Sequence, residues 1–291
     1  MFRGAITALV TPFRNGRVDT AALSSLAEWQ IEKGIDGLLA CGCTGEAAAL
    51  THEEHLHVVR TVLDAADGRV PVLAGTGKND TRSTVELSAE VSAMGVDGVL
   101  VITPYYNKPV AEGQIAHYRA VADAVECPLI VYNVPGRTGT NMTPETIAEL
   151  AGHPRIAGIK DAAGSAERVT AMLCLGLPED FAILSGDDAL AMAQVALGAK
   201  GVISVVSNIA PAAVAELVAL TETGSLAAAR KLQGRLYPLI RAMFLETNPI
   251  PVKCALSLMG MIENEPRLPL TPLSDSCLPA LRAAMEGADL L

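Results

Sequence analysis

Eight short apolar segments recur at a nearly regular interval through the first 208 residues of this 291-residue chain. They are rich in β-branched residues, and their starts advance by about 28 residues, with helical patterns between them. Because they are continuously apolar rather than alternating, they are typical of parallel strands buried on both faces. The segments are GAITALVTPF from Gly4, GLLACG from Gly37, PVLAGTG from Pro71, GVLVITP from Gly98, PLIVYNVP from Pro128, IAGIKD from Ile156, FAILSGDD from Phe181 and GVISVVSN from Gly201.

Three of the junctions between these units contain a pair of glycines with the same spacing, which supports a repeated β/α architecture. Gly34, Gly95 and Gly198 each stand three residues before a second glycine, as expected where a helix ends and the next strand begins. Eight β/α units predict a closed (β/α)8 TIM barrel. The alternative is an open doubly wound sheet, but no G-x-G-x-x-G follows the first strand.

Beyond about residue 209 the strand pattern stops and four helical segments follow. We therefore expect a barrel domain over residues 1–222 and a C-terminal helical domain over residues 223–291. The prolines of Asn248-Pro249-Ile250-Pro251 predict a linker within that second domain.

The composition excludes several classes of function. The chain has 22 Lys plus Arg against 32 Asp plus Glu, a formal charge of −10, which argues against nucleic-acid binding. The chain contains no stretch of about 18 uncharged apolar residues, so no membrane-spanning helix is predicted. The six cysteines are too sparse for a disulfide scaffold, so we expect a reduced, cytoplasmic protein.

In a TIM barrel the functional residues lie where the strands end, and Lys160 is the sharpest candidate there. Burial at a barrel mouth would lower its pKa and supply the neutral amine that attacks a carbonyl. The alternative is a lysine that reaches solvent or pairs with a loop carboxylate. The other lysines occupy helix-to-strand turns, open loops or the C-terminal helices.

Tyr132 ends the preceding strand, so it should meet Lys160 across the barrel mouth and could transfer a proton. A packed aromatic with a satisfied hydroxyl is the alternative. The loop from Gly42 to Glu46 could bind a carboxylate through its backbone N–H groups and the Thr44 hydroxyl, or be a plain tight turn. Arg137, in a glycine loop, suits bidentate carboxylate recognition or is simply a surface residue.

The motifs GCTGE, TPYYNKP, YNVPGRTG, GIKDAAG, SGDD and GVISV occur in this order along the chain. Together they resemble the dihydrodipicolinate synthase and N-acetylneuraminate lyase family of Schiff-base aldolases, over nearly the whole chain. The resemblance implies a (β/α)8 barrel with a C-terminal helical domain, assembled as a homotetramer, a dimer of dimers. It also implies the condensation of pyruvate with L-aspartate 4-semialdehyde in lysine and diaminopimelate biosynthesis. No metal or organic cofactor is expected, since the iminium itself serves as electron sink.

The resemblance assigns roles to individual residues. Lys160 matches the Schiff-base lysine and Tyr132 the proton-transferring tyrosine, while Tyr106 matches a tyrosine lent across a dimer interface. The groups matched to substrate binding are Thr44 and Gly45 for the pyruvate carboxylate, Arg137 for the semialdehyde carboxylate, and Gly186 and Ile203 as lining residues.

Cys43 departs from the family, whose synthases usually carry a threonine there as part of a proton relay. A thiol is a weaker hydrogen-bond partner than a hydroxyl, so we expect a slower relay or a related substrate.

The string His52-Glu53-Glu54-His55-Leu56-His57 lacks the H-E-x-x-H spacing of a zinc site and predicts polar residues on a capped helix. By resemblance, His52, His55, Asn79 and Tyr105 fall where many synthases bind the inhibitor lysine. Ser83 and Ala47 replace the acidic residue and the serine often found there, which predicts weak or absent inhibition by lysine.

Two classes of function follow. The first is a Schiff-base lyase, for which a sugar-acid or another aldehyde is the alternative substrate to the semialdehyde. The second is a non-catalytic sensor that binds a keto acid, which the Cys43 departure keeps open.

Overall fold

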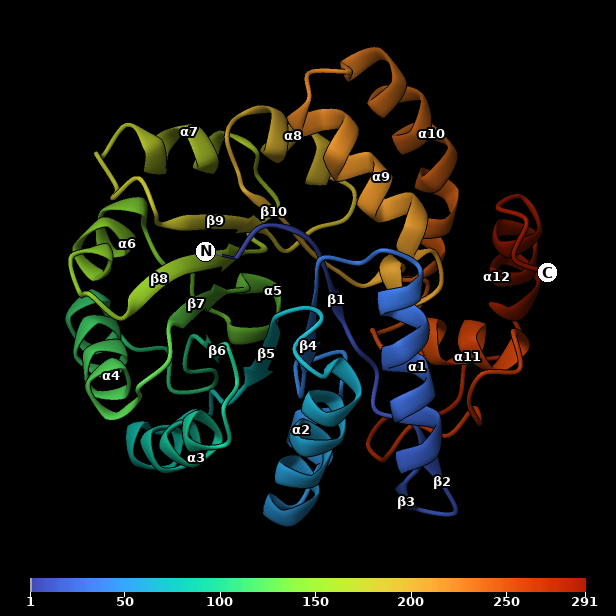
Figure 1. Ribbon diagram of the computed structural model, residues 1–291, viewed down its shortest axis with the longest axis horizontal. Helices are drawn as coiled ribbons and strands as arrows, with labels where there is room; N and C mark the ends of the chain where they lie inside the picture. Colours follow the sequence, from blue (N-terminus) through green and yellow to red (C-terminus); the bar gives the residue numbers. More distant parts are fainter. Residues whose placement is uncertain (1) are drawn as a thin grey trace.

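The computed structural model describes residues 2–291. Eight parallel strands close into a barrel in the order β1-β10-β9-β8-β7-β6-β5-β4, and helices surround it (Figure 1). Each predicted apolar segment contains one of these strands, so the predicted TIM barrel is confirmed. The barrel strands are β1 (Gly4–Ala8), β4 (Gly37–Ala40), β5 (Val72–Gly75), β6 (Gly98–Ile102), β7 (Leu129–Asn133), β8 (Ile156–Asp161), β9 (Ala182–Ser185) and β10 (Gly201–Ser204).

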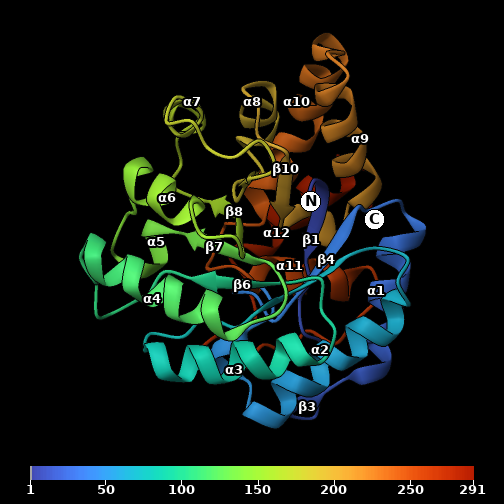
Figure 2. The ribbon, with the colours of Figure 1, turned by 60° about the vertical axis from the view of Figure 1, so that its left-hand side comes forward.

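The helices that follow the strands cover the outer surface of the barrel, and Figure 2 shows them from a second direction. The larger helices of this layer are α1 (Thr20–Glu32), α2 (His52–Ala66), α3 (Thr81–Ala93), α4 (Ala111–Ala124), α6 (Pro144–Ala151), α7 (Glu167–Leu173), α8 (Ala191–Ala196) and α9 (Pro211–Glu222). None of the helices in residues 2–291 is long and apolar enough to cross a membrane.

Local signals in the sequence fix the helix ends. The junction glycines Gly34, Gly95 and Gly198 all have positive φ, as a left-handed residue after a helix requires. Thr51 caps α2 in a reciprocal capping box with Glu54. These local devices set where each β/α unit turns, and thereby the direction in which each strand enters the barrel.

Two apolar cores result from this layering. One lies between the strands and the helices. The other fills the barrel interior with side chains such as Ile6, Leu39, Leu73 and Leu184. It extends to Tyr132, near the end of the barrel where the strands finish. Lys160 is therefore next to a packed apolar interior, not a water-filled channel.

The C-terminal region is helical, as the sequence predicts, and it consists of α10 (Leu226–Ala242), α11 (Ile250–Leu258) and α12 (Leu278–Glu286). Of these, α10 packs against α9 and α12, and α12 also contacts α11; they form one side of the molecule in Figure 1. The expected boundary after residue 222 falls between α9 and α10, and the division into domains stays a prediction. The predicted linker is too long, because Ile250 and Pro251 already belong to α11, whose first turn tolerates a proline.

Short elements that the apolar pattern does not reveal shape the loops. They are the hairpin of β2 (Phe13–Arg14) and β3 (Arg17–Val18), the 3₁₀ turns η1 (Ala47–Ala49) and η2 (Val206–Asn208), and the short helix α5 (Pro135–Thr138).

Candidate active site

Lys160 and Tyr132 come together at the mouth of the barrel. Tyr132 on β7 is in register with Lys160 on β8, and the Lys160 Nζ lies 4.4 Å from the centroid of the tyrosine ring. The lysine is only 6% exposed. The sequence predicted this proximity from neighbouring strand ends, and the structure has it.

The Lys160 amine has an unusual electrostatic environment. Burial lowers its pKa from 10.5 to about 8, since desolvation disfavours the ammonium form; Cys43 and Asp188 oppose the shift and Arg137 adds to it. Within residues 2–291 its Nζ makes no hydrogen bond and no ion pair. This lysine neither pairs with a loop carboxylate nor reaches fully into solvent, which were the alternatives to a reactive amine.

The pKa of Tyr132 is shifted in the opposite direction to that of Lys160. Burial raises its pKa well above 10, and the neighbouring Cys43 raises it further while Arg137 opposes the shift. A phenol in this state keeps its proton near neutral pH, so it is suited to donate a proton to a nearby oxygen. A phenol with a raised pKa and an amine with a lowered pKa therefore lie in contact at the barrel mouth.

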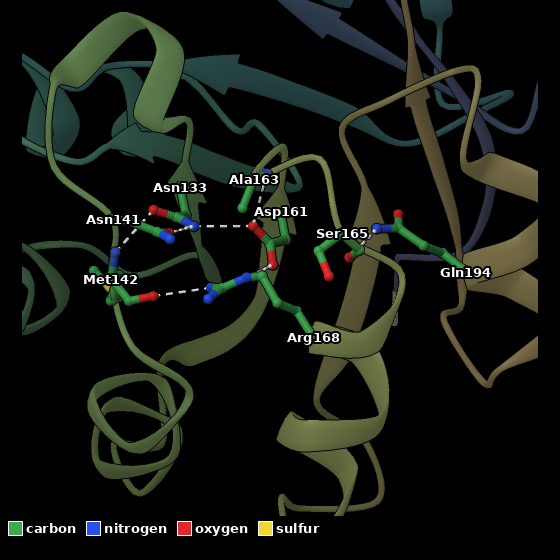
Figure 3. A network of polar contacts seen from close by, with 8 residues as sticks. All are labelled: Asn133, Asn141, Met142, Asp161, Ala163, Ser165, Arg168 and Gln194. Atoms are coloured by element: carbon green, nitrogen blue, oxygen red, sulfur yellow. Dashed lines mark hydrogen bonds and ion pairs between the residues drawn. The ribbon is translucent and has the colours of Figure 1, made fainter.

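A polar network on the outer side of the barrel fixes the two strand ends that carry these residues (Figure 3). Asn133, which follows Tyr132, donates from Nδ2 to the Asp161 carboxylate at 2.9 Å. Asp161, which follows Lys160, pairs with the Arg168 Nε at 2.6 Å. The same arginine donates to the Met142 carbonyl at 2.9 Å. Because side chains alternate along a strand, the network points outward while Tyr132 and Lys160 point to the mouth.

The loop after β4 brings Thr44 and Gly45 to the same rim. The Thr44 hydroxyl accepts a hydrogen bond from the Asn248 amide at 3.0 Å. The Gly45 N–H donates to the Gly42 carbonyl at 3.1 Å. A carboxylate bound here would share that N–H with the turn, so the predicted nest of free backbone donors is partly closed and the Thr44 hydroxyl is the more available group.

A buried ion pair anchors this loop to the C-terminal region. Lys253 on α11 is fully buried, and its Nζ donates to Glu46 Oε1 at 2.6 Å, to the Thr11 carbonyl at 3.0 Å and to the Glu265 carbonyl at 2.8 Å. The Nζ also lies 4.2 Å from the centroid of the Phe13 ring. Sequence reasoning treated Lys253 as one more helix lysine, because nothing local to it reveals its burial.

The remaining expected binding residues lie around this centre. Arg137 on α5 is exposed, and its Nη2 donates to the Asn248 carbonyl at 2.9 Å. Gly186 packs so closely against Ala162 that an added Cβ would approach the alanine Cβ to 2.7 Å. Ile203 is buried in the barrel interior.

Asp188 is a buried carboxylate that the sequence reasoning did not single out beyond its motif. Its Oδ2 accepts from the N–H groups of Val205 and Val206 at 2.9 and 3.1 Å, and burial raises its pKa. The doubled acidic pair that follows a strand in SGDD is the only local signal for it.

A cavity of about 470 Å³ reaches the site at Tyr132, although Lys160, Thr44 and Gly45 do not line it. Its walls include Cys43, Tyr132 and Arg137, together with Tyr105 and the segment around Asn248. Tyr106, in contrast, is 87% exposed and has a φ of 69°, so the structure does not bring it to Tyr132 of the same chain.

Three of the four expected inhibitor residues line this cavity, and Asn79 follows the lining residue Lys78 in the sequence. His52 and His55 line it; His52 pairs with Glu90 at 2.9 Å, and burial lowers the pKa of His55 to about 4. The Asn79 carbonyl accepts from Asn107 at 2.5 Å. Among the described residues, no three His, Cys, Asp or Glu side chains gather as metal ligands.

The comparisons of sequence and of structure both match this chain to dihydrodipicolinate synthases. The model of the dihydrodipicolinate synthetase family matches residues 1–288. A 4-hydroxy-tetrahydrodipicolinate synthase of Trichlorobacter lovleyi is 50% identical over 291 residues, which span 100% of both chains. A dihydrodipicolinate synthase of Acinetobacter baumannii, solved in complex with pyruvate, aligns over 100% of both chains with a TM-score of 0.98 and 44% identity. That of Cyanidioschyzon merolae, solved with lysine bound, aligns over 100% of this chain and 99% of its own, with a TM-score of 0.97 and 40% identity.

Proposed function

Since the chain belongs to the dihydrodipicolinate synthetase family, we propose that it condenses pyruvate with L-aspartate 4-semialdehyde to 4-hydroxy-tetrahydrodipicolinate. This is the activity for which its relatives are named, and it makes the protein a lyase of lysine and diaminopimelate biosynthesis. Location in the cytoplasm stays a prediction from the cysteine content.

The observation that carries the proposal is the buried Lys160 amine, which has a pKa of about 8 and no ion-pair partner in the described residues. The neutral amine attacks the ketone carbon of pyruvate, and loss of water gives an iminium. Removal of a methyl proton then gives an enamine. The enamine carbon attacks the aldehyde, and ring closure by the substrate amine displaces Lys160.

Tyr132 supplies the proton that the departing water needs, because its raised pKa keeps the phenol protonated near neutral pH. Cys43 lies close enough to influence the Tyr132 pKa, as a member of the proton relay would. We infer that Tyr106 of a second subunit completes this relay. Its exposure in the single chain supports the inference, and a homotetramer would supply the interface.

Two groups are suited to bind the two carboxylates. Thr44 and Gly45 would hold that of pyruvate beside Lys160, while Gly186 and Ile203 wall the site. Arg137 would hold the carboxylate of the semialdehyde; beyond its contact with the Asn248 carbonyl, its guanidinium makes no other hydrogen bond in residues 2–291. His52, His55, Asn79 and Tyr105 are proposed to form a lysine site with weak affinity.

Trapping with borohydride tests the proposal. After incubation with pyruvate and reduction, mass spectrometry should find one pyruvyl adduct, on Lys160, and Lys160→Arg should show none. Turnover is then measured with the semialdehyde and with sugar aldehydes. An adduct without turnover on any aldehyde would support the keto-acid sensor, and faster turnover with a sugar aldehyde would support the other aldolase. Absence of the adduct would overturn the Schiff-base mechanism altogether.

A further inference from the structure

Asn248 connects the two carboxylate-binding groups of the site. It lies between α10 and α11, is buried, and forms part of the cavity wall. Its side-chain Nδ2 donates to the Thr44 Oγ1 at 3.0 Å, and its main-chain carbonyl accepts from the Arg137 Nη2 at 2.9 Å. One residue of the C-terminal region thus contacts both the loop after β4 and the short helix α5.

The direction of the hydrogen bond to Thr44 has a chemical consequence. An amide N–H can only donate, so the threonine oxygen must accept, and the hydroxyl hydrogen has to point elsewhere. Within the described residues this hydroxyl donates to no other group. It is therefore left with a free hydrogen at the rim of the barrel where the strands end, and a free O–H donor is what binding of a carboxylate needs.

The side-chain oxygen of Asn248 supports a functional role for this residue. Asn248 Oδ1 is buried and has no hydrogen-bond partner in the structure. Leaving a buried acceptor unpaired is costly, so such groups are rare in interiors unless another requirement keeps them. Orientation of Thr44 is such a requirement, because the amide oxygen in place of the nitrogen would accept the hydroxyl hydrogen and leave none for a carboxylate.

We propose that Asn248 is a positioning residue for pyruvate: its side-chain amide makes the Thr44 hydroxyl a hydrogen-bond donor to the pyruvate carboxylate. Its main-chain carbonyl restrains Arg137 independently of the side chain. The inference rests on the proposed function, because it takes pyruvate as the ligand of Thr44.

The test compares Asn248→Asp and Asn248→Ala. A carboxylate at this position accepts the Thr44 hydrogen and adds a like charge, so Asn248→Asp should raise the half-saturating pyruvate concentration for Lys160 adduct formation about ten- to hundred-fold. Asn248→Ala removes only the donor and should raise it about two- to five-fold. The KM for the semialdehyde should change less than about two-fold in Asn248→Ala, because the carbonyl that holds Arg137 remains and no charge is added.

A Thr44→Val background shows whether Asn248 acts through Thr44. There, Asn248→Ala should leave the pyruvate half-saturation unchanged within about two-fold, and Asn248→Asp should raise it less than in the wild-type background, because only its charge still acts. Should Asn248→Asp fail to fold, the comparison of Asn248→Ala with and without Thr44→Val decides the question in the same way.

The outcomes separate this inference from the proposed function. A wild-type protein that forms no Lys160 adduct would overturn the function and the inference together. A normal wild-type adduct with an unchanged pyruvate half-saturation in Asn248→Asp would overturn the inference alone. An equal rise in both substrate constants in Asn248→Ala, or an undiminished effect in the Thr44→Val background, would assign Asn248 a merely structural role and also refute the inference.

Discussion

Lys253→Met should destabilise the protein strongly, although the residue is more than 200 positions from the loop that it supports. The substitution keeps the length of the side chain but removes three donated hydrogen bonds, to Glu46 and to two carbonyl groups. Glu46 then stays buried with only the Arg267 N–H, at 2.8 Å, as a donor. Removing one partner of a buried pair typically costs about 3–5 kcal/mol. For a chain of this size that corresponds to a fall in Tm of roughly 6–20 °C.

Urea unfolding at fixed protein concentration, followed by circular dichroism, measures this loss. Glu46→Gln should show a loss of similar size, and the double variant should lose less than the sum, because it leaves no uncompensated buried charge. Lys231→Met is the matched control: this lysine is exposed, and its loss should change the free energy of unfolding by less than about 0.5 kcal/mol. A loss below about 1 kcal/mol for Lys253→Met, or full additivity of the two substitutions, would refute the reasoning.

Four further predictions concern activity. The rate of imine formation with pyruvate should rise about five-fold from pH 7 to pH 8 and level off above pH 9, because the Lys160 pKa is about 8; rapid-quench trapping measures it, and a midpoint near 10.5 would contradict it. Cys43→Thr should raise kcat with both substrates, since a hydroxyl is the better relay partner; unchanged or lower turnover would show that the relay is arranged differently. Lysine should inhibit weakly or not at all in steady-state assays, because Ser83 and Ala47 offer no acidic partner for its amine; a low-micromolar inhibition constant is the contrary result. Tyr106→Phe should be nearly inactive alone but regain about a quarter of wild-type activity when reassembled with Lys160→Ala, whose subunits supply the missing phenol; no recovery would argue against a shared site.

The barrel could be predicted because short patterns in the sequence mark the strands and many of the helix ends. The eight strands are almost continuously apolar, and in several units a glycine follows the helix or a capping residue precedes it. These signals are read within about ten residues, and the repetition of the units fixes the topology. The same logic located Lys160 and Tyr132, since the ends of neighbouring parallel strands must meet at one rim.

The parts of the site that could not be predicted depend on contacts between distant segments. Asn248 meets Thr44 across 204 positions, and Lys253 meets Glu46 across 207. No local pattern marks either residue, because the prolines around Asn248 indicate only a bend and the residues around Lys253 only a helix. Their roles follow from how the C-terminal region packs on the loop after β4.

The two buried lysines show why burial alone does not identify a catalytic amine. Lys253 is fully buried, and burial lowers its pKa too, although Glu46 opposes that shift. Glu46 and two carbonyl groups occupy all three of its N–H donors, so this amine is held in contacts that leave it no access to a substrate. Lys160 lies against a phenol ring instead, with no carboxylate in contact, and desolvation therefore shifts it toward the neutral amine. Its reactivity thus requires that its nearest acid, Tyr132, be too weak to protonate it, and the raised pKa of that phenol meets the requirement.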